Sequence, residues 1–450
     1  MKIVIVGAGL AGLTSAYRLH QLGYDVELYE ARCRPGGRVC TAYFDGSYEE
    51  FGGKNIRDGG DALSIRALIK EMGLSTQTTS LDILSGFFYF NDQIFSIKDL
   101  ISSGPKPTES LYQALFEKTL KTNTLAELIA PLFQKNPALN ALIRQNMRGY
   151  MGTCPSKISS KYLDIGFWEF YKMKHDAACD PKTNRYFIME DIIGGNSLLI
   201  DALVKKLKGH VHYSKPLRKV SFDHKLRLQF GADTFVSADY LILAIPASTL
   251  KDVDIANGLI PQDQLFAIHT QQYATNAKIL LPFKQNMMNA NIYSCFEQLG
   301  IWLNKSSDVM TWYYGGSYGD FAHDSVLETF TNGLAQLHKI LPVVTSHHHQ
   351  SIAIMKDKFM AHYHGPVAVS WVQEEFSKGS YSNLSPEQFD VFNLTTQLGG
   401  ERVRYVYRPV NGKIFFSGEH ASIHAPSTLE GAVESGEQAA RLLHAVSRFR

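Results

Sequence analysis

The sequence predicts an α/β protein in which a doubly wound parallel sheet is joined to a second, mixed α+β domain. Residues 2–6 are a short apolar run rich in β-branched side chains, which is typical of a parallel strand buried on both faces. Apolar residues at helical spacing follow as far as Gly23, and a second strand-like run covers residues 25–30. From about residue 86 to 190 the pattern becomes helical, aromatic and irregular, which indicates a second unit.

Length and composition favour a globular protein of two packed domains. The chain has 450 residues, of which 45% are hydrophobic and 20% are charged. The formal net charge is +2 and no long stripe of Lys or Arg occurs, so we do not expect nucleic acid as a partner. No apolar run reaches the roughly 20 residues that span a bilayer, and the start lacks a signal-peptide pattern. We therefore expect a cytoplasmic protein without a membrane span.

The cysteines and histidines predict neither a disulfide framework nor a metal site. The cysteine number is odd and no C-x-x-C pair occurs, so we expect reduced thiols. The run His347-His348-His349 lacks the spaced partners of a metal site, and we interpret it as a solvated loop. The cysteines are Cys33, Cys40, Cys154, Cys179 and Cys295.

A glycine motif at residues 7–12 predicts a dinucleotide site. Gly7-Ala8-Gly9-Leu10-Ala11-Gly12 is a G-x-G-x-x-G sequence that follows a strand, opens a helix and precedes Glu30 at the end of the next strand. Gly7 permits a tight turn, Gly9 lets the backbone approach a pyrophosphate, and Gly12 allows close packing of helix and strand. The helix N-terminus can bind phosphate, and Glu30 can accept hydrogen bonds from a ribose.

The segment after Glu30 favours FAD over NAD. Residues 31–39 carry three arginines and two adjacent glycines, and a guanidinium is a planar fork of donors suited to phosphate. The run resembles the second signature of the flavin-containing amine oxidase family, E-A-R-x-R-x-G-G-R. In these first two motifs the resemblance implies cofactor contacts from Gly7, Gly9, Ala11, Gly12, Leu13, Glu30, Ala31, Arg32, Gly37, Arg38 and Val39.

Six further segments are similar to flavin-facing segments of the same family: 50–55, 194–198, 216–220, 244–246, 414–419 and 430–436. The last of these resembles the start of the family's final helix, whose N-terminus would lie near the flavin ring and stabilise its reduced anion. The implied cofactor contacts are Gly52, Gly53, Lys54, Asn55, Leu217, Ala244, Pro246, Gly418, Glu419, Thr428, Leu429 and Ala432.

The resemblance also implies catalytic positions. Lys278, in an apolar strand at about 276–283, aligns with the family lysine that holds a water near flavin N5; the alternative is an outward-facing lysine on an edge strand. Tyr381 matches the first aromatic wall of the substrate cage, and its alternative is a core tyrosine with a satisfied hydroxyl. Trp371 is expected to line the same cavity. Thr428 stands where the second cage aromatic is expected.

Three departures from the family pattern narrow the expectation. Thr428 makes an aromatic sandwich around the substrate doubtful, and Ser380 replaces the cysteine that some relatives use for covalent attachment, so we predict non-covalent FAD. L-amino-acid oxidases bind the substrate carboxylate with an arginine near the segment that Gly52-Gly53 resembles, and Asn55 occupies the nearest aligned position in this sequence. Arg57, two residues on, is the residue that could compensate. An α-amino-acid substrate is therefore not supported.

The resemblance implies an FAD-dependent amine oxidase that transfers a hydride from an amine C–N group to flavin N5, with oxygen as the final acceptor. Two alternatives stay open: a desaturase or dehydrogenase of a lipid or terpenoid on the same scaffold, and an interaction protein in which the flavin is structural. The expected partners are a small amine and oxygen, with a homodimer left open. We expect an FAD domain from residues 1–85, 190–285 and 405–450, and a substrate domain from 86–189 and 286–404.

Overall fold

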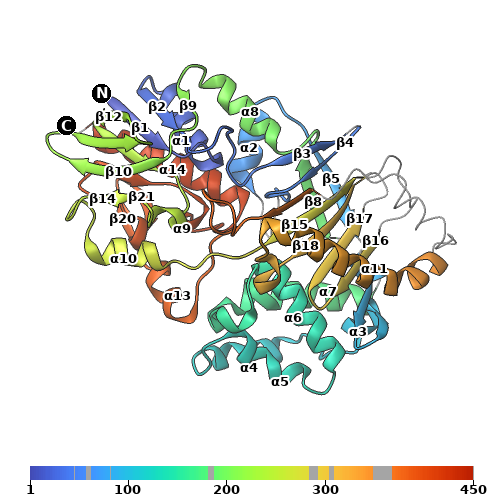
Figure 1. Cartoon of the computed structure of the whole chain (residues 1–450). Coiled ribbons are helices and arrows are strands. Elements are labelled where there is room, and N and C mark those ends of the chain that lie inside the picture. Colours follow the sequence, from blue (N-terminus) through green and yellow to red (C-terminus); the bar gives the residue numbers. More distant parts are fainter. Residues whose placement is uncertain are drawn as a thin grey trace.

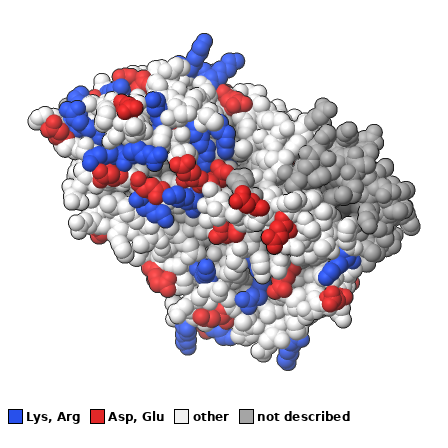
Figure 2. Space-filling model, viewed as in Figure 1, with Lys and Arg blue, Asp and Glu red and all other residues white. Residues whose placement is uncertain are grey.

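The computed structural model describes residues 1–44, 46–56, 62–81, 83–180, 187–282, 292–303, 309–347 and 367–448. Arg57, His348 and His349 lie outside these ranges. None of the described helices is both long and apolar enough to cross a bilayer. All five cysteines are free thiols. On the face seen in Figure 2, Lys and Arg side chains are interspersed with Asp and Glu rather than gathered into a stripe of one sign.

A five-stranded parallel sheet organises the first unit of the fold and confirms the predicted α/β class. Its order is β22-β13-β1-β2-β9, and every neighbouring pair is parallel. Three distant parts of the chain supply it: β1 (Lys2–Val6) and β2 (Asp25–Tyr29), then β9 (Val211–His212) and β13 (Tyr240–Leu243), and finally β22 (Ile414–Phe416). The two chain ends therefore lie near one another at this sheet (Figure 1).

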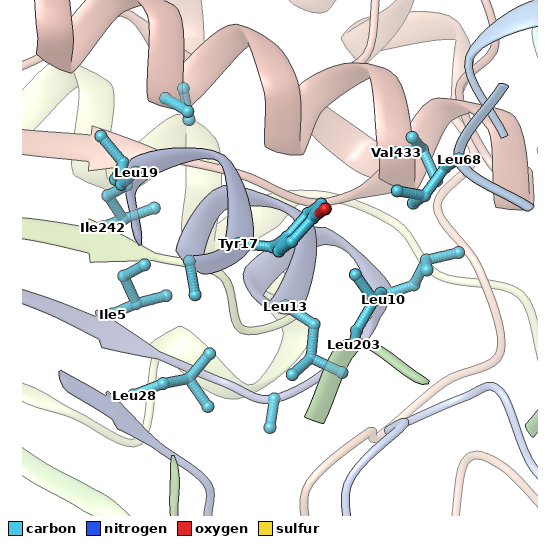
Figure 3. Packing of buried hydrophobic residues seen from close by; sticks show 14 of the residues in the cluster. Ile5, Leu10, Leu13, Tyr17, Leu19, Leu28, Leu68, Leu203, Ile242 and Val433 are labelled. Carbon is cyan, nitrogen blue, oxygen red and sulfur yellow. The ribbon is translucent and has the colours of Figure 1, made fainter. Parts of the chain in front are cut away.

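Both faces of β1 are buried, which explains its unbroken apolar run. Ile3 and Ile5 belong to a core with the helices α1 (Leu10–Gln21), α2 (Leu63–Glu71), α8 (Ser197–Lys206) and α14 (Leu429–Ser447). Figure 3 shows Leu13 and Leu19 of α1 beside the sheet residues Ile5 and Ile242. The predicted helix after the glycine motif (α1) and the predicted final helix (α14) thus pack on the same face of the sheet.

The other face of the parallel sheet carries a second sheet rather than helices alone. Val4 and Val6 pack into a core with β10 (Leu217–Phe222), β11 (Leu226–Phe230) and β12 (Thr234–Ala238). These strands form a four-stranded sheet with β14 (Asp254–Ile255), in the order β12-β11-β10-β14. The short helices α9 (Ala247–Leu250) and α10 (Gln262–Thr270) complete this layer. The doubly wound arrangement is therefore modified on one face, because residues 217–238 form a meander of short strands.

A seven-stranded sheet forms the second unit. Its order is β19-β15-β18-β17-β16-β6-β7. The strands are β6 (Phe87–Phe90), β7 (Gln93–Ser96), β15 (Ala277–Pro282), β16 (Ile292–Phe296), β17 (Leu299–Leu303), β18 (Val309–Tyr314) and β19 (Val367–Ser370), and α11 (Val326–His347) packs on one face. The sequence-based division puts residues 277–282 in the FAD domain, and residues 86–189 with 286–404 in the substrate domain. The pairing instead joins β15 to the strands of the substrate domain, because an apolar run does not reveal its partners.

The predicted helical region is present below this sheet in Figure 1. It contains α3 (Ile97–Ser102), α4 (Glu109–Thr119), α5 (Leu125–Phe133), α6 (Pro137–Met151) and α7 (Glu169–Cys179), packed around a core with Phe133, Phe167 and Tyr171. The remaining elements are two hairpins, β3 (Thr41–Phe44) with β4 (Ser47–Glu50) and β20 (Thr395–Leu398) with β21 (Glu401–Arg404), the pair β5 (Thr76–Leu81) with β8 (Phe187–Ile192), and α13 (Pro386–Asn393).

Candidate active site

One cavity of about 730 Å³ runs from the glycine loop after β1 to the inner face of the seven-stranded sheet and α6. Its lining contains all the predicted site residues except Gly12 and Leu13: Gly7, Gly9, Ala11, Glu30, Ala31, Arg32, Gly37, Arg38, Val39, Gly52, Gly53, Lys54, Asn55, Leu217, Ala244, Pro246, Lys278, Trp371, Tyr381, Gly418, Glu419, Thr428, Leu429 and Ala432. Residues from five distant stretches of sequence therefore meet at one site.

The three motif glycines each meet a different steric demand. Gly7 has a φ of +105°, and a Cβ there would lie 2.8 Å from the carbonyl oxygen of Ala244. A Cβ on Gly12 would lie 2.0 Å from the carbonyl oxygen of Gly7, so this glycine lets α1 pack against the loop. A Cβ on Gly9 would meet no atom within 4 Å and would stand in the cavity itself. The space that Gly9 leaves is what a pyrophosphate needs.

Glu30 is fixed by the glycine loop. Its carboxylate accepts hydrogen bonds from the N–H groups of Ala8 at 2.7 Å and Arg32 at 2.9 Å, one on each oxygen. Each oxygen keeps a second lone pair for a ribose hydroxyl at the cavity wall. Leu13, by contrast, is fully buried in the helix-side core, and its N–H donates to the Gly9 carbonyl at 2.9 Å. Its role as a cofactor contact therefore gains no support from its position.

Arg38 is paired with a carboxylate across the cavity wall. It donates to Glu419 Oε1 at 2.8 Å and to the Ser380 carbonyl at 2.7 Å. Burial disfavours the charged form of Glu419, but the Arg38 charge and hydrogen bonds outweigh it and hold the pKa of Glu419 below its usual range. Arg32 donates to Ser377 Oγ at 2.9 Å. Both arginines line the cavity, and each is already hydrogen-bonded to a segment that lies far away in the sequence.

Lys278 is a buried cation on an interior strand. Its side chain lies on β15, which pairs with β18 on one side and β19 on the other, so the edge-strand alternative is wrong. The residue is 7% exposed, and Nζ donates to the carbonyl oxygens of Glu50 at 2.7 Å and Gly52 at 3.0 Å. Burial lowers the pKa of Lys278 to about 8. An ammonium has three hydrogens, and two are bonded to these carbonyls.

The two predicted aromatic residues, Trp371 and Tyr381, lie in the same lining as Lys278. Trp371 is buried, and its indole N–H donates to the Phe51 carbonyl at 3.2 Å, next to Gly52. The Tyr381 hydroxyl donates to the Tyr150 carbonyl at 2.7 Å. The hydroxyl is therefore hydrogen-bonded within the protein, as the alternative of a core tyrosine predicts, but the side chain also lines the cavity. Its ring is the part that remains to contact a substrate.

The N-terminus of α14 meets the cavity at Thr428. The Thr428 hydroxyl accepts a hydrogen bond from the Gly431 N–H at 3.0 Å and donates to the Ala425 carbonyl at 2.7 Å. Thr428 is therefore the helix cap, two residues before the predicted start at Glu430. Glu430 itself accepts from the N–H groups of Ser64 and Ile65 at the start of α2. The positive end of the α14 dipole is left directed at the cavity.

The far end of the cavity was not predicted from the sequence. It is lined by Gln145 and Asn146 of α6, Phe170 of α7, Tyr293 of β16, and Gly300, Trp302 and Tyr313 of β17 and β18. The sequence does contain one signal for this part of the cavity. The amide side chains of Gln145 and Asn146 interrupt the apolar helix face that includes Leu142 and Met147. Within the described ranges no group of three or more His, Cys, Asp or Glu could hold a metal ion.

Comparison with known proteins places the chain among flavoenzymes. The family described as flavin containing amine oxidoreductase matches residues 10–444. A nicotine dehydrogenase of Pseudomonas putida (strain DSM 28022 / S16) is 23% identical over 98% of this chain and 87% of its own length. An L-amino-acid oxidase of Demansia vestigiata is 23% identical over 99% of this chain and 87% of its own. The structure of cyclohexylamine oxidase from Brevibacterium oxydans IH-35A superposes with a TM-score of 0.71 at 16% identity, covering 100% of this chain and 99% of that one.

Proposed function

The chain belongs to the family of flavin-containing amine oxidoreductases, and we propose that it is an FAD-dependent amine oxidase with oxygen as the final electron acceptor. The relatives carry names of enzymes that act on nicotine, L-amino acids and cyclohexylamine. The observation that carries the proposal is Lys278, a cation buried in the cavity wall and bonded to the backbone at Glu50 and Gly52. Burying a cation is unfavourable, and such groups concentrate at functional sites.

The residues of the cavity fit FAD held without a covalent bond. Gly9 leaves space for a pyrophosphate, and Glu30 offers carboxylate lone pairs for a ribose. The N-terminus of α14 supplies a positive dipole end for a ring that gains negative charge on reduction. Ser380, buried and hydrogen-bonded to Asn276, offers no thiol for attachment. When bound, FAD supplies the hydride acceptor of the reaction.

The protein's own part is to orient the amine and to place a water. Tyr381 contributes its ring face, because its hydroxyl is bonded to the Tyr150 carbonyl. Trp371 is held by the Phe51 carbonyl and makes a rigid wall beside it. The third hydrogen of the Lys278 ammonium is the donor that would hold a water and assist flavin reoxidation.

A neutral amine is required for loss of a hydride, so the rate of flavin reduction should rise with pH through the pKa of the substrate amine. The measurement is the reduction rate at saturating amine between pH 6 and 10. A rate that stays flat across the substrate pKa would contradict this part of the mechanism.

One observation favours a second function. Thr428 caps α14 at the position where the resemblance implies the second aromatic residue of the cage, so Tyr381 lacks that aromatic partner. A C–C desaturase or dehydrogenase of a lipid or terpenoid would have no need of an amine cage.

The two functions differ in their products. The test is to incubate the FAD-loaded protein in air with a panel of primary and secondary amines, and to measure oxygen uptake, hydrogen peroxide and released amine or ammonia. Equal amounts of oxygen consumed and peroxide formed with one amine class support the amine oxidase. No turnover with any amine, together with flavin reduction by a hydrocarbon substrate, would replace it with the dehydrogenase.

A further inference from the structure

The backbone carbonyls of residues 50–54 are all held by side chains. This segment begins at the end of β4, and residues 51–54 line the cavity without belonging to a helix or strand. A backbone carbonyl outside regular structure needs some partner, which is often water. The five consecutive carbonyl oxygens here accept instead from three side chains far apart in the sequence: Lys278 (at Glu50 and Gly52), Trp371 (at Phe51) and Asn196 (at Gly53 and Lys54).

Asn196 holds segment 50–54 from outside the cavity lining. The residue is 3% exposed and does not line the cavity. Its Nδ2 donates to the carbonyls of Gly53 and Lys54 at 2.9 Å each, and its Oδ1 accepts from the Ile192 N–H at 3.2 Å. The amide thus uses both hydrogens and its oxygen, and only one orientation satisfies all three partners, with the nitrogen facing the two carbonyls.

Helix capping does not account for this side chain. Asn196 precedes α8 at the N-cap position, where an asparagine oxygen commonly accepts from an N–H of the first turn, but its side chain makes no cap hydrogen bond. Its backbone N–H donates to Glu50 Oε1 at 2.7 Å, and Thr41 Oγ1 donates to the same carboxyl oxygen at 2.9 Å. Asn196 is therefore bonded to both ends of segment 50–54, by its N–H at the start and by its amide at the end.

The two glycines before Asn196 permit this close approach. Gly194 and Gly195 have φ values of +91° and +102°, which favour glycine. A Cβ on Gly195 would lie 2.5 Å from Thr41 Cγ2, so the loop packs on Thr41 only without a side chain there. Residues 194–198 resemble a flavin-facing segment, yet none of them lines the cavity. Their contact with the cavity wall is made through segment 50–54.

Lys278 depends on the same segment for its orientation. Two of its ammonium hydrogens are bonded to the carbonyls of Glu50 and Gly52. An ammonium rotates about its Cε–Nζ bond, so two fixed acceptors define the direction of the third hydrogen. The carbonyls that Asn196 holds come directly after Gly52 in the chain. A shift of these carbonyls would therefore also shift an acceptor of Lys278.

We propose that Asn196 is a positioning residue for Lys278: it fixes segment 50–54 and thereby aims the third hydrogen of the Lys278 ammonium into the cavity. This inference rests on the proposed function of Lys278 in flavin reoxidation and adds to it a residue outside the cavity lining. Without the two amide hydrogen bonds, segment 50–54 keeps its bonds to Lys278 and Trp371 only on the cavity side, and the ammonium loses its fixed acceptors.

The first measurement is the pKa of Lys278 in the apoprotein. The rate at which trace acetic anhydride modifies Lys278 is followed by peptide mass spectrometry from pH 6 to 10, in the wild type and in Asn196→Ser. Serine suits a helix N-cap and lacks both amide hydrogens. Hydrogen bonds to the ammonium stabilise its charged form, so we expect the pKa of Lys278 to fall by about one pH unit in the variant. Asn196→Leu is the second variant and should give the same direction.

Lysine modification is chosen because Lys278 has ionisable neighbours. These are Glu49 and Glu50 of β4, Lys54, and Tyr313 of β18. Burial raises the pKa of Glu50 to about 7, so a pH–rate profile alone would mix its titration with that of Lys278. The chemical modification reports the ammonium of Lys278 by itself.

The second measurement asks whether Asn196 acts through Lys278. The flavin of the FAD-loaded protein is reduced with stoichiometric dithionite, so that no amine is needed, and its reoxidation by oxygen is followed by stopped-flow absorption. Asn196→Ser should slow reoxidation about fivefold, because misplaced groups lose much of their effect. In a Lys278→Met background the same substitution should change the rate less than about twofold, because the two residues act as one unit.

Ser197→Ala is the matched control at the next position. Ser197 Oγ accepts from the Thr41 N–H at 2.9 Å and bonds to none of the carbonyls of segment 50–54. This variant should keep both the pKa of Lys278 and the reoxidation rate of the wild type. Urea denaturation of each apoprotein shows whether the control and Asn196→Ser lose comparable stability, so that a general loosening of the fold is distinguished from a specific effect on Lys278.

The outcomes separate this inference from the function on which it rests. If the pKa of Lys278 is the same in the wild type and in the Asn196 variants, or if Asn196→Ser slows reoxidation equally with and without Lys278, the inference is wrong and Asn196 is only structural. If Lys278→Met leaves reoxidation unchanged, the proposed function of Lys278 fails, and the pKa of Lys278 still decides whether Asn196 positions its ammonium.

Discussion

Replacing Gly9 by Ala should weaken FAD binding while the protein still folds. Gly9 has a φ of −72°, which alanine adopts freely, and its added Cβ would meet no protein atom within 4 Å. At an N-cap, alanine is less favourable than glycine, so the free energy of unfolding of the apoprotein should fall by about 1 kcal/mol. The new methyl group occupies the space proposed for the pyrophosphate. Overpacking of that kind costs about 1–3 kcal/mol, or roughly a five- to 150-fold weaker affinity for FAD.

The neighbouring glycine provides the matched comparison. A Cβ at Gly12 would lie 2.0 Å from the Gly7 carbonyl oxygen, so Gly12→Ala should destabilise the apoprotein by more than about 3 kcal/mol. The assay is titration of each apoprotein with FAD, followed by flavin fluorescence, beside chemical denaturation without FAD. If Gly9→Ala binds FAD as tightly as the wild type, no phosphate approaches Gly9 and the assigned cofactor position is wrong.

Substitutions at three further residues test the remaining assignments. Lys278→Met should slow flavin reoxidation by oxygen at least about tenfold while changing anaerobic reduction less, as measured by stopped-flow absorption; equal effects on both steps would remove the proposed role in reoxidation. Tyr381→Phe should keep flavin reduction within about threefold of wild type, because the hydroxyl is bonded to the Tyr150 carbonyl, whereas Tyr381→Ala should lose at least about tenfold. Burial lowers the pKa of Lys174 from 10.5 to about 7, so between these pH values the folded state binds fewer protons than the unfolded state and stability rises with pH. From pH 7 to 9, the free energy of unfolding of the wild type should rise by about 2 kcal/mol more than that of Lys174→Met, as measured by urea denaturation. Parallel pH profiles of the two proteins would refute the lowered pKa.

The nucleotide half of the site could be predicted because its determinants are local. The turn at Gly7, the space at Gly9 and the contact at Gly12 all arise within one strand-turn-helix unit, and Glu30 returns to the same loop through the Ala8 N–H. The distant segments were placed by resemblance, and the cavity gathers residues from five of the six, whereas residues 194–198 contribute none to its lining. The sequence analysis singled out Thr428 because an aromatic residue is missing there. In the structure Thr428 caps α14 by accepting a hydrogen bond from the Gly431 N–H, and a Thr at the start of a helix is a cap signal that the sequence contains.

The substrate half could not be predicted because its determinants are tertiary. Lys278 was expected near the flavin, yet whether its strand lay at an edge depended on β18 and β19, which come later in the chain. Asn146 and Trp302 are more than 150 positions apart, and only the packing of α6 against the inner face of the sheet brings them to one cavity end. The same limit explains why strand β15 was assigned to the other unit.

The most direct test of the amine oxidase assignment is the visible spectrum of the FAD-loaded protein during anaerobic addition of amines. The account predicts that one amine class bleaches the flavin absorption, that air restores it, and that denaturation releases the flavin intact. A bound flavin that no amine reduces, in a protein that otherwise folds and binds FAD normally, would contradict the proposed function.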